Sequence, residues 1–184
     1  MTIDKINKIN DLGIQMINKG FHHNFAGLIT TWKDEEKYDC TPINTELFAF
    51  TGGDGDHFSY LDVNKNVSII VMTVPANYGK TVDAYNIILA ETFEEFLGLG
   101  YYKGWTSLDG YLYYSQETLI DYGIGQKDYS FCNQNDTLFL KEVISQLVIE
   151  PVFLSEERLK YLKEQYFQIL EFNQNFLQGL NCKK

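Results

Sequence analysis

The densest group of reactive side chains in the sequence is Asp54, Asp56 and His57, which stand within a run of glycines. Two carboxylates and an imidazole can bind a metal ion, or can form an acid–base pair that orients a water molecule. In an extended segment the two aspartates share one face and His57 points to the other, so either scheme needs a further residue from elsewhere in the chain. A metal-dependent hydrolase built on these three residues is the third-ranked hypothesis for function.

The same segment also has the composition of a tight turn, because Gly52, Gly53 and Gly55 surround Asp54. Aspartate side chains bond to nearby backbone amides, and glycine accepts positive φ angles. We therefore interpret the three glycines as structural turn residues. No catalytic residue, metal ion or cofactor is expected at this place.

Two other segments resemble ligand-binding motifs but lack an essential residue. Residues 62–66 open like a calcium-binding loop, yet Val67 stands where that loop requires glycine. Residues 79–81 resemble the end of a phosphate-binding loop, whose first glycine would fall at Val74. The three cysteines are widely spaced and include no C-x-x-C pair, so neither a disulfide framework nor a zinc site is indicated.

Composition gives the clearest limits on partners. The chain has 184 residues, and its 25 acidic residues against 15 basic ones give a net charge of −10. Such a charge repels nucleic acid and anionic membranes and attracts cationic partners. The sequence has no signal peptide and no stretch long and apolar enough to cross a membrane, so a cytoplasmic location is expected.

The first half of the chain predicts one helix followed by a sheet. Apolar residues recur at helical spacing over residues 2–19, and β-rich runs follow at 46–50, 57–61 and 67–74. Short, turn-rich linkers join these runs, which favours an antiparallel meander. The third run is apolar in both of its alternating positions, so we expect a central strand that is covered on both faces.

The following segment predicts a strand and then a helix. Residues 87–89 are apolar and suit a short strand, after which Thr92 and Glu95 have the spacing of a capping box. The helix that they open is expected to end near Gly98 or Gly100.

The remainder of the chain predicts three helical segments. A short helix is expected near 107–117, a second over 138–147 with Thr137 as its cap, and a C-terminal helix over about 155–176. Pro151 separates the last two.

Three segments together resemble the SUKH superfamily, a group named for a fungal cell-wall regulator and abundant as bacterial immunity proteins. These are the glycine-rich turn with its HFSYL strand in 48–61, the IVMTVP strand in 70–75 and the EEFLGLG helix in 90–100. The resemblance covers about 48–100. It implies a single α+β domain over 1–184, with a central, mostly antiparallel sheet flanked by helices.

The resemblance also implies a protein-binding role without catalysis. Many bacterial members are thought to bind and neutralise polymorphic toxins, often nucleases, and an acidic protein suits a basic toxin domain. The leading hypothesis is therefore an immunity protein that occludes its toxin, and the alternative is a regulatory or scaffold protein with an endogenous partner. The expected partner-binding residues are Asp34, Glu35, Glu36, Asp54, Asp56 and, as an exposed aromatic anchor, Trp105.

Overall fold

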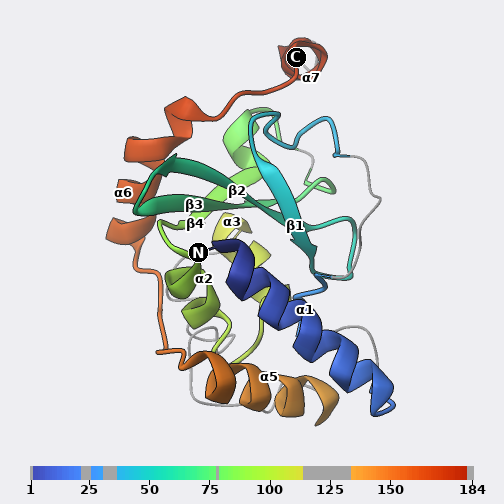
Figure 1. Cartoon of the computed structure of the whole chain (residues 1–184). Coiled ribbons are helices and arrows are strands. Elements are labelled where there is room, and N and C mark those ends of the chain that lie inside the picture. The colour runs from blue at the N-terminus through green and yellow to red at the C-terminus, as the bar shows by residue number, and fades with distance from the viewer. Residues whose placement is uncertain (1, 22–25, 31–36, 78, 114–133, 182–184) are drawn as a thin grey trace.

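An antiparallel sheet with helices around it makes up the computed structural model of the chain (Figure 1), which describes residues 2–21, 26–30, 37–77, 79–113 and 134–181. The expected α+β class, with an antiparallel sheet and helices, is therefore confirmed. Within the described residues, no helix is long and apolar enough to cross a membrane.

The sheet is the predicted meander. Its strands are β1 (Glu46–Phe50), β2 (His57–Asn64), β3 (Val67–Thr73) and β4 (Asn86–Ala90). They lie in the order β1-β2-β3-β4, and every neighbouring pair is antiparallel. Residues 69–72 of β3 have no exposed surface, which confirms a strand between two partners with both faces covered.

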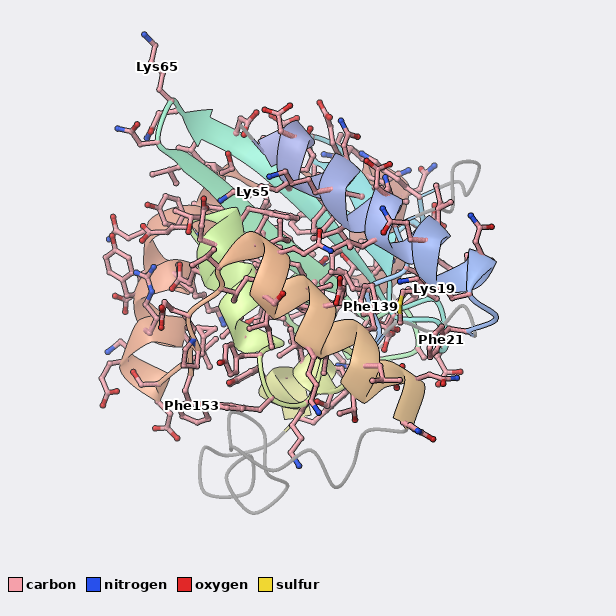
Figure 2. The ribbon with its side chains drawn as sticks, turned by 60° about the horizontal axis from the view of Figure 1, so that its bottom comes forward. Lys5, Lys19, Phe21, Lys65, Phe139 and Phe153 are labelled. Carbon is pink, nitrogen blue, oxygen red and sulfur yellow. The ribbon has the colours of Figure 1, made fainter. Side chains whose placement is uncertain are left out.

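Helices surround this sheet. They are α1 (Thr2–Asn18), α2 (Phe93–Leu99), α3 (Gly110–Tyr113), α5 (Gln134–Leu147), α6 (Glu156–Tyr166) and α7 (Gln174–Asn181), with 3-10 turns at Val82–Ala84, Thr106–Asp109 and Phe167–Ile169. Helix α6 packs along β4, while α1 and α5 pack on each other below the sheet (Figure 1). Phe139 of α5 is completely buried at the α1–α5 contact (Figure 2).

The two faces of the sheet have different covers. Phe58 of β2 packs against Phe96 of α2, with ring centroids 5.0 Å apart. His57 precedes Phe58 and therefore points to the other face, where its imidazole bonds to Thr41. Helix α2 thus covers one face, and the segment 37–45 covers the end of the other face beside the β1–β2 connection.

Helix ends follow from local sequence. The hydroxyl of Thr92 accepts a hydrogen bond from the amide of Glu95 at 3.1 Å, which confirms the first half of the predicted capping box. Helix α1 ends at Asn18, and Gly20 follows with a φ of 87° in the left-handed region, where the sequence predicts a helix stop. The amide of Phe21 then donates to the carbonyl of Met16 at 3.1 Å, as a glycine-terminated helix requires.

The C-terminal helix expected over 155–176 is instead two helices. Helix α6 begins at Glu156, next to the predicted start, with Ser155 as its cap, but it ends at Tyr166 and α7 starts only at Gln174. The reason is a long-range pairing: the side chain of Asn44 donates to the carbonyl of Ile169 and accepts from the amide of Glu171. These bonds hold the backbone near residue 170 in an extended form that sequence periodicity cannot reveal.

Two other helix predictions also need correction. Helix α5 includes Gln134, so Thr137 lies inside the helix and does not cap it. The short helix expected near 107–117 is a 3-10 turn that continues into α3, and residues 114–117 lie outside the described part of the chain.

Candidate functional site

The glycine-rich segment forms the connection between β1 and β2, and we call residues 51–56 the acidic turn. Two backbone bonds close it: the amide of Thr51 donates to the carbonyl of Asp56, and the amide of Asp56 donates to the carbonyl of Gly53, both at 2.9 Å. The hydroxyl of Thr51 adds a bond to the carbonyl of Asp56 at 3.3 Å. The backbone of the turn is therefore fixed by its own residues, and its carboxylates are not needed for closure.

Glycine is required at particular positions of this turn. Gly52 and Gly55 have φ angles of 88° and 80°, which agrees with the turn role that the sequence predicts for them. A Cβ atom on Gly55 would also lie 2.4 Å from the Tyr38 hydroxyl oxygen. Gly53 differs, because its φ is not positive and a Cβ there would meet no atom within 4 Å. Asp54, at the exposed tip, has a φ of 47°.

His57 is a structural residue of this site. Its side chain is buried, and Nδ1 donates to the carbonyl of Gly55 at 2.8 Å, so that Nε2 accepts from the hydroxyl of Thr41 at 3.0 Å. Burial lowers the pKa of His57, with a smaller contribution from the charge of Lys37, despite the bond to Gly55. The imidazole is therefore neutral, and it joins the acidic turn to the segment 37–45.

Asp56 is the unusual residue of the turn. Its exposed fraction is 9%, and its Oδ1 atom is buried without a hydrogen-bond partner. Burial first, and then the charges of Asp109 and Asp54, raise the pKa of Asp56 to about 7. Burial also raises the pKa of Asp109. The turn therefore holds a carboxyl group that is ready to ionise when a cation approaches.

A small pocket opens at the acidic turn. It has a volume of about 150 Å³, and its walls are the acidic turn residues 52–56 with the rings of Tyr38 and Phe50. Tyr38 stacks on His57 with ring centroids 5.7 Å apart, which fixes the position of one aromatic wall. Carboxylates beside aromatic faces attract cations, through charge and through the ring quadrupole.

Metal ligation fits this arrangement poorly. Within the described part of the chain, no three His, Cys, Asp or Glu side chains are placed to hold one metal ion. Asp54, Asp56 and His57 are all described, so the turn does not bring them together as the ligand set considered in the sequence. Both nitrogens of His57 are also engaged with protein atoms, which leaves no lone pair for a metal or a water.

The expectation for Trp105 is corrected by its burial. Its side chain has no exposed surface, and its Nε1 donates to the carbonyl of Phe96 at 3.2 Å. A Cβ atom on Gly100 would lie 2.2 Å from the indole, so glycine at that position makes room for it. Trp105 is therefore a core residue that packs on α2, and it cannot anchor a partner at the surface.

The other expected partner-binding residues divide into two groups. Asp54 and Asp56 both line the pocket of the acidic turn. Residues 34–36, which include Asp34, Glu35 and Glu36, lie outside the described residues.

Sequence reasoning missed three contributors to the site. Asp109 is far from the turn in sequence, yet its charge contributes to raising the pKa of Asp56. Tyr38 and Phe50 line the pocket, yet aromatic residues are so frequent in this chain that neither is conspicuous. Only the cross-strand position of Phe50, opposite His57, could have been derived from the predicted hairpin.

A second group of acidic side chains provides a contrast. Arg158 of α6 donates through Nε to Glu95 at 2.9 Å and through Nη2 to Glu91 at 2.6 Å. The hydroxyls of Tyr161 and Tyr166 also donate to Glu91. These carboxylates are thus fully partnered, and they hold α6 against α2 and the end of β4.

Comparison with protein-family models, with curated proteins and with solved structures finds no match to this chain.

Proposed function

We propose that the chain is a non-enzymatic protein-binding module, and that it acts as an immunity protein that neutralises a polymorphic toxin by occluding it. The toxin is expected to carry a basic cleft, as a nuclease does, and the two proteins meet in the cytoplasm. The acidic turn contributes to the contact surface. The observation that carries the proposal is the turn itself, where Asp54 is exposed and Asp56 has a carboxylate oxygen without a partner.

Three further features support this proposal. The net charge of −10 favours a cationic partner and fast, salt-sensitive association. The α+β architecture agrees with the fold that the SUKH resemblance implies, and the motifs of that resemblance fall on the acidic turn, β3 and α2. His57, the obvious candidate for a catalytic base, is neutral and has both ring nitrogens bonded within the protein.

A regulatory or scaffold protein remains the second candidate, and one observation favours it. A groove of about 580 Å³ lies between Ile43 and the segment 170–177, and its walls include Leu170, Phe172 and Leu177. This surface mixes apolar side chains with the polar ones of Glu171, Asn173 and Gln174, so a partner that bound there would not need to be strongly basic. Such a partner would be recovered from cells that carry no toxin gene.

Co-expression with the product of the adjacent gene tests the leading proposal. We expect rescue of host survival and a complex that co-purifies at low salt and weakens at high salt, because screening reduces attraction between surface charges. Asp54→Lys should weaken the complex, whereas the matched change Asp11→Lys, on the exposed face of α1, should not. Absence of both rescue and complex at low salt would overturn the immunity role in favour of the scaffold.

A further inference from the structure

We propose that the cavity between α6, β4 and α3 is a binding site for a small amphipathic anion, a carboxylate with a chain of about eight carbon atoms. This inference does not depend on the proposed protein-binding function. It is carried by the apolar walls of the cavity and by the lysines that line it, one of which is held there by an ion pair.

The size of the cavity fits a small molecule. Its volume of about 330 Å³ lies at the lower end of the range for small-molecule sites. At about 30 Å³ for each water-sized group, the cavity has room for about ten non-hydrogen atoms. Octanoate has about that number, so a medium-chain carboxylate would fill the space.

Four apolar side chains from four parts of the fold line the cavity. They are Ile87 of β4, Leu112 of α3, Leu159 of α6 and Phe167 of the 3-10 turn that follows α6. Each of them packs against the hydrophobic core but is only partly buried. An apolar chain that entered the cavity would remove apolar surface from water, which favours binding.

Two lysines of α6 bring positive charge to the same cavity. Lys160 and Lys163 are three residues apart and both line it, so they lie on one side of the helix. Nζ of Lys163 is 2.5 Å from Oδ2 of Asp83, which also lines the cavity, so this ammonium group is held at the wall. An ammonium group has three N–H donors, and the bond to Asp83 uses one of them. Donors therefore remain for the carboxylate of a ligand.

The charges at the cavity select the sign of the head group. Two lysines against one aspartate give a local excess of one positive charge, in a chain whose net charge is −10. Glu164 lies 3.8 Å from Lys160, but both side chains are largely exposed, so this pair compensates the charge only weakly. A carboxylate would be attracted by this excess, whereas an ammonium head group would be repelled.

The walls of the cavity are in place before a ligand binds. Arg158 joins the start of α6 to Glu91 and Glu95, and Lys163 joins its later part to Asp83. Helix α6 is therefore fixed beside β4 (Figure 1), and a ligand does not have to order it. A preformed site lowers the entropic cost of binding.

NMR titration of the full chain at pH 7 tests the site with three eight-carbon probes that differ in their head group. The probes are octanoate, octanol and octylammonium. We expect octanoate to cause saturable shifts of the methyl groups of Ile87, Leu112 and Leu159. It should bind about threefold more tightly than octanol and about tenfold more tightly than octylammonium, because only its head group matches the lysines.

Lysine variants separate the head-group contact from the apolar contact. Lys163→Met should weaken octanoate about tenfold and octanol less than twofold, because the charge-assisted bond is lost and Asp83 is left unpaired. Lys163→Arg keeps the charge and should retain the preference for octanoate, whereas Lys160→Met should weaken octanoate about twofold. Lys65→Met, at the exposed tip of the β2–β3 hairpin (Figure 2), changes the net charge equally and should leave binding unchanged.

Several results would overturn the site. These are equal binding of the three probes, tightest binding of octylammonium, shifts that do not saturate or that fall on methyl groups outside the cavity, and unchanged octanoate binding in Lys163→Met. The toxin experiment is separate: rescue of the host by a chain that ignores octanoate refutes this site alone. Octanoate binding without any toxin complex refutes the immunity role alone.

Discussion

Two acidic clusters of this protein differ in how their carboxylates are partnered. At the contact between α6, α2 and β4, Arg158 bonds to the carboxylates of both Glu91 and Glu95. Glu91 also accepts hydrogen bonds from two tyrosine hydroxyls. At the acidic turn, Asp56 has a buried oxygen without a partner, and the charges of Asp109 and Asp54 add to burial in raising its pKa. The first cluster stabilises the fold, whereas the buried oxygen without a partner lowers stability at the second.

The pKa values express the same difference. Burial alone would raise the pKa of Glu91, but the hydrogen bonds from Tyr166 and Arg158 outweigh burial and lower it. At Asp56 no donor opposes burial, and the pKa rises to about 7. The chain therefore uses its single arginine to join α6 to α2, whereas the turn keeps a carboxyl group of raised pKa.

Removing the arginine should have the largest effect on the free energy of unfolding. Arg158→Met leaves the partly buried carboxylates of Glu91 and Glu95 without a cation, and we expect the free energy of unfolding at pH 7 to fall by about 2–3 kcal/mol in urea denaturation. Lys160→Met on the same helix removes only the exposed pair with Glu164, so it should change stability by less than about 0.5 kcal/mol. Equal effects of the two variants would show that the network does not hold α6.

The stabilisation that Arg158 provides should disappear at acidic pH. The folded-state pKa of Glu91 is lowered, so the stabilisation is present at neutral pH and is lost as pH falls through that lowered value. Comparison of the wild type with Arg158→Met in urea from pH 7 to pH 3 measures this loss.

Neutralising the turn should stabilise the protein. The folded-state pKa of Asp56 is raised from 3.8 to about 7, so ionisation costs stability as pH rises between these values. Asp56→Asn removes this cost, and we expect a gain of about 2 kcal/mol at pH 8 that vanishes near pH 4. Asp11→Asn is the control, and a loss of stability on Asp56→Asn at pH 8 would contradict the account.

The turn backbone should respond to glycine substitution at one position and not at another. Gly55→Ala introduces a side chain at φ 80° and against the Tyr38 hydroxyl, so we expect a loss of about 1.5 kcal/mol in thermal or urea unfolding. Gly53→Ala meets open space and should be neutral within about 0.5 kcal/mol. Similar losses in both variants would mean that the turn has another conformation.

Loss of the hydrogen bond between Thr41 and His57 should have the smallest effect on stability. Thr41→Val removes the hydroxyl that donates to Nε2 of His57, and we expect a loss of about 1 kcal/mol. Thr41→Ser retains the hydroxyl and provides the control for the bond, measured in the same urea titrations. If the valine variant were no less stable than the serine variant, His57 would not depend on this bond.

Local signals explain how much of the fold the sequence could predict. The meander from 46 to 73 and the cap at Thr92 depend on alternation, turn residues and hydrogen bonds over a few positions. The break of the C-terminal helix depends on Asn44, which lies 125 residues before Ile169. Periodicity within a segment carries no information about such a distant pairing.

The candidate site was predictable to a smaller extent. Gly52, Gly55 and Asp54 are predictable as turn residues because positive φ angles favour glycine and aspartate. The burial of Trp105 and the approach of Asp109 to Asp56 depend on how distant segments pack, so the sequence predicted an exposed tryptophan and did not find the carboxyl pair.

Carboxyl-detected NMR titration of the free chain measures both clusters in one experiment. The account predicts a midpoint of about 7 for Asp56, together with a midpoint for Glu91 below the ordinary glutamate value of 4.5. An Asp56 midpoint near 3.8, as for an exposed aspartate, would contradict the claim that the turn holds a buried carboxyl group without a partner.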